Sequence, residues 1–348
     1  MYFASDNAGP AHPKVMEALM KANEGYATGY GGDAIMDEVR AQIRDVFEAP
    51  EAAVYLVING TSANSILLGT MTQPWETVFC SDWAHIHKDE GHAPEFYTGS
   101  KLTLVPSTAG KMSVDDLQHA ILGEGNRGVH GSQRGPISIT QVTEFGTIYT
   151  LDEIKALTAT AQEFGLKTHL DGARFANAMV ALDCSAAEMT WKAGIDTVSF
   201  GGTKNGAVAV EACVIFDPDL AWEFELRRKR GGHLLSKHRF LSAQMNAYLT
   251  DDLWLDLARA ANAQCVQLAE GLRGHDGADI LFEPQANMIF FNMTRQEHKR
   301  MLDAGAVYYV ENGDPYAGDP EERLMGRLVT DWSITAACVT QFLDLLRG

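Results

Sequence analysis

The 348 residues exceed the usual length of one domain, and 46% of them are apolar against 21% charged, so we expect a large domain plus a smaller one. A formal net charge of −18 argues against nucleic acid or an anionic membrane surface as a partner, since both need a basic face. Five scattered cysteines without a CxxC pair favour reduced thiols in a cytoplasmic protein. The first residues lack a basic region followed by an apolar core, so we expect no signal peptide.

Between residues 53 and 217, apolar β-branched runs alternate with helical patterns. This alternation predicts parallel strands joined by crossover helices. The predicted strands are residues 53–59, 77–80, 102–105, 137–142, 167–170, 197–200 and 212–216. The longest uncharged run, residues 52–75, has a polar centre, which indicates a strand, a turn and a helix and not a membrane span.

Two of the helices between these strands have recognisable starts. Ser113 with Asp116, and Thr150 with Glu153, have the spacing of reciprocal capping boxes. The second helix carries a core-facing stripe formed by Leu151, Ile154, Leu157, Ala161 and Phe164. Gly165 follows the stripe and is expected to end that helix.

The texture changes after about residue 245 to a long helical stretch and short strands. The predicted elements there are strands near 280–292 and 327–330, an exposed loop at 312–323, and a final helix from Ser333 with Val339, Phe342, Leu343 and Leu346 on its apolar face. The predicted fold class is therefore α/β. We expect a large domain over residues 1–245, with a mostly parallel sheet flanked by helices, and a small C-terminal α+β domain over residues 246–348.

The first predicted strand runs into a turn of small residues that includes Gly60, Thr61 and Ser62. Such a turn at a helix start presents backbone amides and hydroxyls to an anion, with the helix dipole favouring negative charge. Thr61 or Ser62 could instead simply cap the helix. The chain lacks GxGxxG and GxxxxGK[ST], which weakens dinucleotide and Walker-type interpretations.

Two later strand ends also carry reactive side chains. Asp171 follows the strand at 167–170 and could keep a pyridinium nitrogen protonated, or cap a helix while paired to Arg174. Lys204 lies in a glycine-rich turn after the next strand, where its amine suits Schiff-base exchange. An anion turn, a strand-end Asp and a strand-end Lys in this order are much more specific than any one of them.

Residues 84–92 combine His85, His87 and His92 with nearby acids, a composition also seen at metal sites. Together with His169 and Asp171 they could form a hydrolytic zinc centre. The chain has no HExxH motif, and that interpretation leaves the lysine turn without a role. The competing role for His85 is to lie flat against a cofactor ring and to handle protons.

Together these motifs resemble the pyridoxal-phosphate (PLP)-dependent L-threonine aldolases, within the aspartate-aminotransferase-like superfamily of PLP fold type I. The resemblance runs nearly end to end. It is carried by Ser5-Asp6-Asn7, Tyr30-Gly31-Gly32-Asp33, Asn59-Gly60-Thr61, Ala84-His85-Ile86, Asp171-Gly172-Ala173-Arg174, Gly202-Thr203-Lys204 and Arg327-Leu328-Val329-Thr330.

The resemblance implies a role for each matching residue. The phosphate would be held by the turn at 60–62, His85 would stack on the PLP ring, Asp171 would bind the ring nitrogen, and Lys204 would form the Schiff base. The implied cofactor-binding residues are Gly60, Thr61, Ser62, His85, Asp171, Arg174, Lys204 and Lys237. No metal is implied.

On the substrate side, the resemblance implies that Ser5, Arg174 and Arg327 receive a carboxylate. Tyr30 and a basic residue between 228 and 237 would reach a neighbouring subunit's site, so a homo-oligomer, a dimer or tetramer, is expected. Lys237 follows Gly231-Gly232-His233, whereas the family usually has three glycines and then an Arg.

A second departure lies at Glu144, which stands where many family members have a histidine that contacts the β-hydroxyl. His85, Glu144 or a water are therefore alternative bases, and this variant looks like the branch that accepts phenylserine-type substrates.

The expected enzyme is an aldehyde-lyase that reversibly cleaves L-threonine, L-allo-threonine or phenylserine-type β-hydroxy-α-amino acids to glycine and an aldehyde. Another fold-type-I lyase or transferase and a metal-dependent hydrolase are the alternatives. A non-catalytic binding role fits the coordinated polar strand ends less well.

Overall fold

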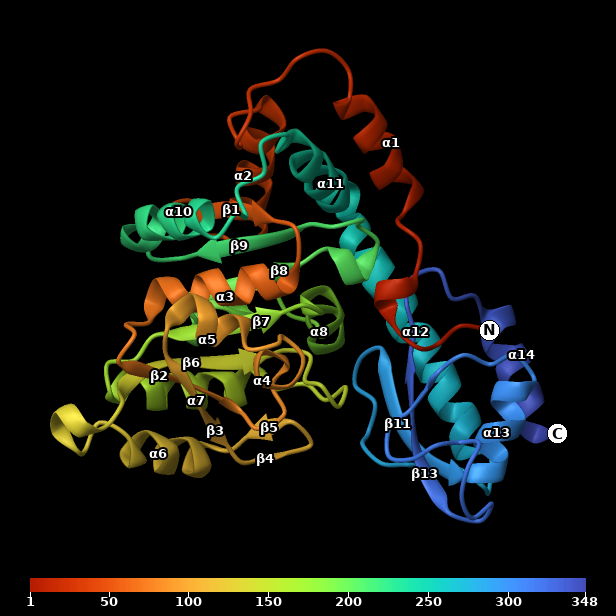
Figure 1. The fold of residues 1–348 in the computed structure, drawn as a ribbon. Helices are drawn as coiled ribbons and strands as arrows, with labels where there is room; N and C mark the ends of the chain where they lie inside the picture. Colours follow the sequence, from red (N-terminus) through yellow and green to blue (C-terminus); the bar gives the residue numbers. More distant parts are fainter.

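A computed structural model describes residues 1–348 as two sheets with helices around them (Figure 1). The larger sheet has seven strands in the order β1-β9-β8-β7-β6-β2-β3. Their bounds are β1 Ala53–Val57, β2 Glu76–Ser81, β3 Lys101–Val105, β6 Gln133–Thr140, β7 Thr168–Gly172, β8 Thr197–Gly201 and β9 Glu211–Ile215. All seven predicted strands are present, and a short hairpin of β4 (Ser107–Thr108) and β5 (Lys111–Met112) accompanies them.

Strand β9 corrects the prediction of parallel strands throughout this region. It pairs antiparallel with both β1 and β8, while β2, β3, β6, β7 and β8 pair in parallel. Between β8 and β9 there is only a turn with a short 3-10 helix, η4 (Thr203–Asn205), and no crossover helix. A parallel return needs a connection of a dozen residues or more, so this short link reverses the chain.

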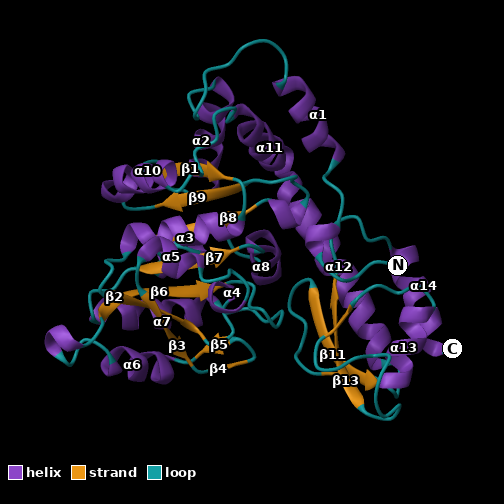
Figure 2. Cartoon of the chain, in the orientation of Figure 1, coloured by secondary structure: helices purple, strands orange, loops and turns teal.

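Helices cover both faces of the larger sheet (Figure 2). Strand β1 shows the division: Val54 and Leu56 pack in the core with α2, α7, α8 and α11, whereas Tyr55 and Val57 pack toward α3 and α10. The helices of this part are α1 Pro13–Ala22, α2 Ala34–Val46, α3 Gly60–Met71, α4 His85–Lys88, α5 Ala93–Thr98, α6 Val114–Gly123, α7 Leu151–Glu163, α8 Phe175–Leu182, α9 Ala186–Met189, α10 Ala221–Arg230 and α11 Arg239–Leu249.

Only one of the two predicted capping boxes is complete. Thr150 and Glu153 form a complete capping box at α7, and Gly165 follows that helix with φ +68°. Ser113 caps α6, but its hydroxyl donates to the Asp116 carboxylate, which therefore does not reach back to the Ser113 amide. The shorter Asp side chain explains the difference from Glu153.

The second sheet has the order β10-β11-β13-β12 and is antiparallel throughout. Its elements are α12 Leu253–Arg273, β10 Asp279–Ile280, β11 Met288–Thr294, α13 Arg295–Asp303, β12 Tyr309–Val310, β13 Arg323–Val329 and α14 Ala336–Arg347. The final helix begins three residues later than predicted, because Ser333 bonds to Asp331 in a turn and Thr335 is the cap. Val339, Phe342 and Leu346 are buried as predicted.

The N-terminal residues pack on this second sheet. Phe3 donates its amide to the Val307 carbonyl and accepts from the Val329 amide, at 2.7 and 2.8 Å. Its ring is fully buried among residues of α12, β11 and α14. The division into domains at residue 245 stays a prediction. No helix combines the length and apolar character that a membrane crossing requires.

Candidate active site

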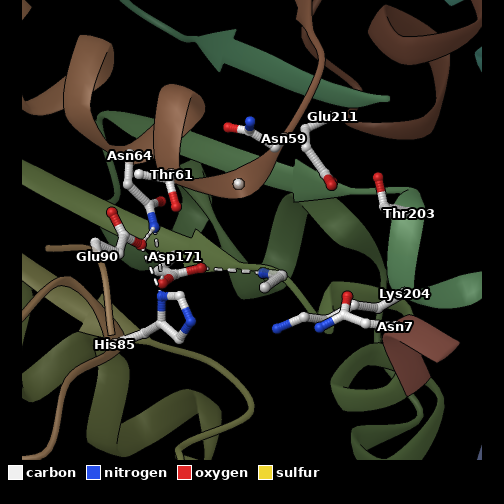
Figure 3. A pocket seen from close by; sticks show the side chains of 12 residues that line it. Asn7, Asn59, Thr61, Asn64, His85, Glu90, Asp171, Thr203, Lys204 and Glu211 are labelled. Carbon is white, nitrogen blue, oxygen red and sulfur yellow. Dashed lines mark hydrogen bonds and ion pairs between the residues drawn. The ribbon is translucent and has the colours of Figure 1, made fainter. Parts of the chain in front are cut away.

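A cavity of about 180 Å³ opens where α3 begins and where β7 and β8 end (Figure 3). Eleven of its twelve lining residues are not hydrophobic, so the site is built for a polar ligand. The lining residues are Asn7, Asn59, Gly60, Thr61, Asn64, His85, Glu90, Asp171, Ala173, Thr203, Lys204 and Glu211. Five residues predicted for the site, at positions 60, 61, 85, 171 and 204, are among them.

The start of α3 faces the cavity with backbone groups and a hydroxyl. Asn59 is the helix cap, because its Oδ1 accepts from the Ser62 amide at 2.8 Å, so neither Thr61 nor Ser62 is the cap. The Ser62 hydroxyl donates to the Asn59 carbonyl at 2.8 Å and does not line the cavity. A Cβ built on Gly60 would meet no atom within 4 Å, so this face of the turn is open to a ligand.

A hydrogen-bonded cluster forms the opposite end of the cavity. The Asn64 amide donates to Glu90 Oε1 at 2.8 Å and to Asp171 Oδ2 at 3.0 Å. Glu90 Oε1 also contacts His85 Nδ1 at 2.8 Å. Asn64 Oδ1 accepts from the Ser199 hydroxyl at 2.7 Å, which fixes the orientation of the amide. The carboxylate of Asp171 is therefore held by Asn64 of α3, whose amide is in turn fixed by Ser199 of β8.

His169, two residues before Asp171 on β7, extends this cluster along the same face of the sheet. Its Nδ1 lies 2.9 Å from the Ser138 hydroxyl and its Nε2 lies 3.1 Å from the Ser199 hydroxyl. Ser199 already donates its one proton to Asn64, so we infer that His169 Nε2 carries hydrogen and Nδ1 accepts from Ser138. Complete burial lowers the pKa of His169 to about 4 and keeps this ring neutral.

The same geometry bears on the metal alternative. His85, Glu90 and Asp171 each offer a ligand atom within 4.8 Å of the others. However, the Asn64 amide already donates a hydrogen bond to each of the two carboxylates. His169 has both ring nitrogens occupied by serines, and His92 is exposed and contacts Glu95. The arrangement favours a hydrogen-bonded network over a zinc centre.

His85 is one of three titratable groups that line this end of the cavity, together with Glu90 and Asp171. Burial opposes its charged form, but the hydrogen bond with Glu90 and the nearby carboxylates of Glu144 and Asp171 outweigh burial and raise the pKa of His85 above its ordinary value. Because Nδ1 is held by Glu90, Nε2 is the nitrogen left to exchange protons with a ligand.

Lys204 comes from η4, in the link between β8 and β9. The Gly202 amide donates to Glu211 Oε2 at 2.8 Å, and Asn205 donates to the Tyr248 hydroxyl at 2.8 Å. These contacts anchor the turn on both sides of Lys204. Its side chain extends into the cavity, where Figure 3 shows it beside Asn7.

The residues predicted to hold a carboxylate meet at the N-terminal segment. Arg174 donates to both carboxylate oxygens of Asp6, at 2.7 and 2.9 Å, and not to Asp171. Burial disfavours both charges, but their attraction prevails, so the pKa of Asp6 is lowered and that of Arg174 is raised. Arg327 donates to the Ala4 carbonyl at 3.2 Å, which places Ser5 between the two arginine contacts.

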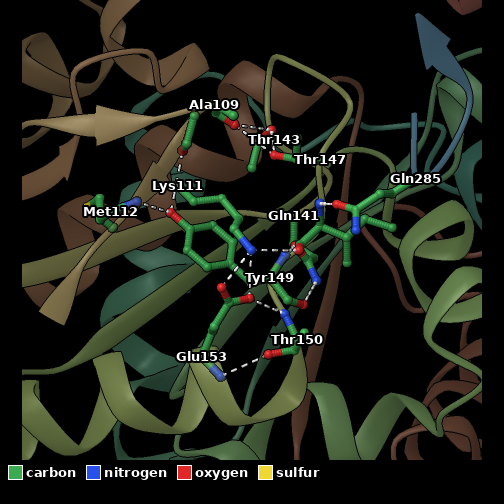
Figure 4. Close-up of polar contacts among 12 residues, drawn as sticks. Ala109, Lys111, Met112, Gln141, Thr143, Thr147, Tyr149, Thr150, Glu153 and Gln285 are labelled. Atoms are coloured by element: carbon green, nitrogen blue, oxygen red, sulfur yellow. Dashed lines mark hydrogen bonds and ion pairs between the residues drawn. The ribbon is translucent and has the colours of Figure 1, made fainter. Parts of the chain in front are cut away.

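Hydrogen bonds of Gln141, Thr143 and Thr147 hold the segment after β6 in place (Figure 4). Glu144 belongs to this segment in the sequence. The Gln141 side-chain amide donates to the Tyr149 carbonyl at 2.8 Å and accepts from the Tyr149 amide at 2.9 Å. The Thr143 and Thr147 hydroxyls are 2.7 Å apart, and Thr147 donates to a neighbouring carbonyl. Glu144 itself is half-buried and does not line the cavity, but its charge acts on His85.

Tyr30 and Lys237, which are predicted to serve a neighbouring subunit, do not line the cavity of their own chain. Tyr30 and Lys237 are both exposed, and the Tyr30 amide donates to the Ser236 carbonyl at 3.1 Å. The Lys229 ammonium lies 5.2 Å from the Tyr30 ring centre. Tyr30 and Lys237 are thus brought near each other on the surface.

Sequence reasoning assigned no role to Asn59, Asn64, Ser199, Glu90 or Glu211. A signal existed for Glu211, because a single acid begins the otherwise apolar run of β9. Glu90 was visible only as one of several acids near the histidines. Asn64 is one helical turn after Gly60, so its position on the cavity face follows from the helix that starts there.

A family model for beta-eliminating lyases matches residues 2–296. This chain belongs to the beta-eliminating lyase family. A low-specificity L-threonine aldolase of Pseudomonas aeruginosa is 39% identical over 313 residues, covering 90% of each chain. Another from a Pseudomonas species is 39% identical over 336 residues, covering 94% of this chain and 96% of the relative.

The solved structure of Leishmania major threonine aldolase has a TM-score of 0.92 to this lyase-family chain, at 27% identity, and covers 99% of this chain and 98% of its own. The predicted threonine aldolase family and the α/β PLP fold type I are therefore confirmed.

Proposed function

We propose that this lyase-family chain is a PLP-dependent aldehyde-lyase that cleaves β-hydroxy-α-amino acids, such as L-threonine, L-allo-threonine or phenylserine-type compounds, to glycine and an aldehyde. One observation carries the proposal: a single polar cavity brings together the Lys204 amine, the anchored Asp171 carboxylate and the open start of α3. The relatives named low-specificity L-threonine aldolase support the reaction.

The donor set fits PLP. The Gly60 and Thr61 amides at the start of α3 would hold the phosphate, Lys204 would attach the aldehyde carbon, and Asp171 would pair with the ring nitrogen. When bound, PLP supplies an electron sink for the electrons of the cleaved Cα–Cβ bond. Asn64 and the Ala173 amide each donate to Asp171, which aims its carboxylate at one position.

For the substrate, we propose that Ser5, Arg174 and Arg327 receive the carboxylate. Nε and Nη2 of Arg174 donate to Asp6, which orients the guanidinium. Nη1 is then left for the substrate. We assign proton exchange with the β-hydroxyl to His85 Nε2, with Glu90 holding the ring and Glu144 contributing its charge.

An aromatic cluster supports acceptance of an aromatic β-substituent. Phe145 follows Glu144, and its ring centre lies 4.9 Å from Trp83, 4.7 Å from Phe282 and 5.5 Å from Phe290. The cluster joins the segment after β6 to the second sheet, and Trp83 precedes His85 by two residues in the chain. We propose that it contacts the side chain that leaves as the aldehyde.

We further propose a homo-oligomer, a dimer or a homotetramer, with Tyr30 and Lys237 reaching a neighbouring subunit's cavity. Both residues are exposed and neither lines the cavity of its own chain, which supports this. A cytoplasmic location is proposed from five free cysteines, three of them buried.

Lys204→Ala tests the proposed function most directly. Wild-type protein should show the visible absorption of bound PLP and release aldehyde from threonine or phenylserine. The variant should lose the visible band and at least about 10³-fold of the activity, because no other amine of the chain lines the cavity. Lys155→Ala, on the surface of α7, is the control and should match wild type.

The alternatives give different results in the same assay. Another fold-type-I lyase or transferase would bind PLP but release no aldehyde. A metal-dependent hydrolase would be stopped by a chelator and would tolerate hydroxylamine. A colourless wild-type protein with full activity would exclude the PLP assignment.

A further inference from the structure

Glu211 is a buried acid at the end of the cavity that we assign to a phosphate. It is the first residue of β9, pairs across the sheet with Val57 and Gly201, and is only 6% exposed. Its carboxyl group points into the cavity beside Thr203 and the start of α3 (Figure 3). Oε2 accepts from the Gly202 amide, and the adjacent Thr203 also bonds to this carboxyl group, which faces the cavity.

Few charges surround this carboxyl group. Lys204 on η4 is the cation that acts on it, and Tyr248 on α11 and Cys213 on β9 are the titratable groups that feel its charge. The neighbours on β1 and β8, Val57 and Gly201, do not titrate. The acids Glu90 and Asp171 line the opposite end. Glu211 and the residues at the start of α3 thus line one cavity.

An ionised Glu211 and a phosphate dianion would repel each other across this small space. A protonated Glu211 would instead keep one oxygen on the Gly202 amide and donate the other as O–H to the phosphate. Burial supports the protonated form: it outweighs the hydrogen bonds from Thr203 and Gly202 and the charge of Lys204, and raises the pKa of Glu211 to about 7.

We propose that Glu211 is a cofactor-binding residue that binds the phosphate group of PLP as a neutral acid, so that PLP loading takes up one proton when Glu211 is ionised beforehand. The inference rests on the proposed function, which places the phosphate at the start of α3. It adds to the family motif a group that makes cofactor affinity depend on pH.

The test compares PLP affinity of the apo-forms of wild type and Glu211→Gln between pH 6 and 8.5. The neutral amide of Gln mimics the protonated acid, so the two Kd values should be similar at pH 6. By pH 8 the wild-type Kd should be about tenfold higher relative to the variant, because one proton must be bound. Taking the ratio cancels the titration of free PLP, which is common to both measurements.

Pyridoxal, which lacks the phosphate, is the second probe. Its Kd ratio should not change with pH, and a change as large as that for PLP would show that Glu211 acts on the lysine turn, which overturns the proposal. A flat ratio for PLP would overturn it as well. If neither protein binds PLP at any pH, the proposed function fails instead.

Proton uptake by wild type alone covers the case in which Glu211→Gln does not fold. Calorimetry at pH 7.5 in buffers of different ionisation enthalpy should give an uptake for PLP that exceeds that for pyridoxal by about 0.7 proton, given half-ionisation near pH 7. Equal uptake for the two probes would contradict the proposal.

Discussion

The two ends of the cavity are constructed differently. At the Asp171 end, side chains from α3, β6, β7 and β8 form one continuous chain of hydrogen bonds through Asn64, Ser199 and His169. At the other end, where the first turn of α3 faces the cavity, the donors are backbone amides and single hydroxyls, and Glu211 is the one acid. Coupled side chains fix the position of the Asp171 carboxylate, which must face a single ring atom. A phosphate has several equivalent oxygens and needs only several donors around it.

The largest expected difference between the ends is in turnover. Asp171→Asn should retain PLP, because the phosphate end and Lys204 are untouched, yet lose about 10²- to 10⁴-fold in kcat since the ring nitrogen loses its anionic partner. Bound PLP is measured by absorbance and kcat by aldehyde release. Full activity with a normal spectrum would remove the distinct role of this end.

The second difference is in the pH dependence of stability. The pKa of His169 is about 4 in the folded state, below its ordinary value, so its contribution is present above about pH 6.5 and lost as the pH falls toward 4. Between pH 7 and 5 this amounts to about 2 kcal/mol. His169→Gln should therefore lose less free energy of unfolding in urea titrations over this range than wild type.

Glu211 gives the opposite sign. Its pKa of about 7 lies above the ordinary value of 4.5, so its contribution is present below pH 4.5 and lost as the pH rises through 7. As the pH rises from 5 to 7.5, the free energy of unfolding of apo Glu211→Gln should increase relative to that of the apo wild type. The exposed His119→Gln is the control for both series and should follow wild type. Parallel curves for all four proteins would contradict the distinction.

The smallest expected effect is at Thr61. Thr61→Ala should weaken PLP binding by about tenfold, the value of one hydrogen bond to a charged group, with kcat at saturating PLP within about twofold of wild type. Ser62→Ala is a matched control, because the Ser62 hydroxyl bonds to the Asn59 carbonyl instead of facing the cavity. Equal losses of affinity in both variants would show that the hydroxyl acts through the helix and not on PLP.

Strand-end positions were predictable because they follow from alternation and turn residues. Asp171 and Lys204 end or follow buried strands, and parallel strands deliver such residues to one edge of a sheet. The supporting residues were not predictable in the same way. The contacts of these residues form only when three separate parts of the chain pack together. Asn64 comes from α3, Glu90 from the segment after β2, and Ser199 from β8, and no local sequence pattern encodes their contacts.

The corrected details have the same origin. The antiparallel direction of β9 depends on the short, nine-residue link between β8 and β9. The apolar pattern locates the strands but does not indicate their direction. The pairing of Arg174 with Asp6 joins residues 168 positions apart, whereas the sequence suggested its near neighbour Asp171. Glu144 stays a predicted contributor whose direct contact with substrate is untested.

The packing of Phe3 on the second sheet, with Asp6 three residues later bound to Arg174, has a practical consequence for recombination. A chimera made by exchanging only the C-terminal hundred residues with a relative would leave Phe3 against a foreign surface and disturb the aim of Arg174. The exchangeable block is therefore discontinuous in sequence: it must carry the N-terminal residues around Phe3 together with the C-terminal region.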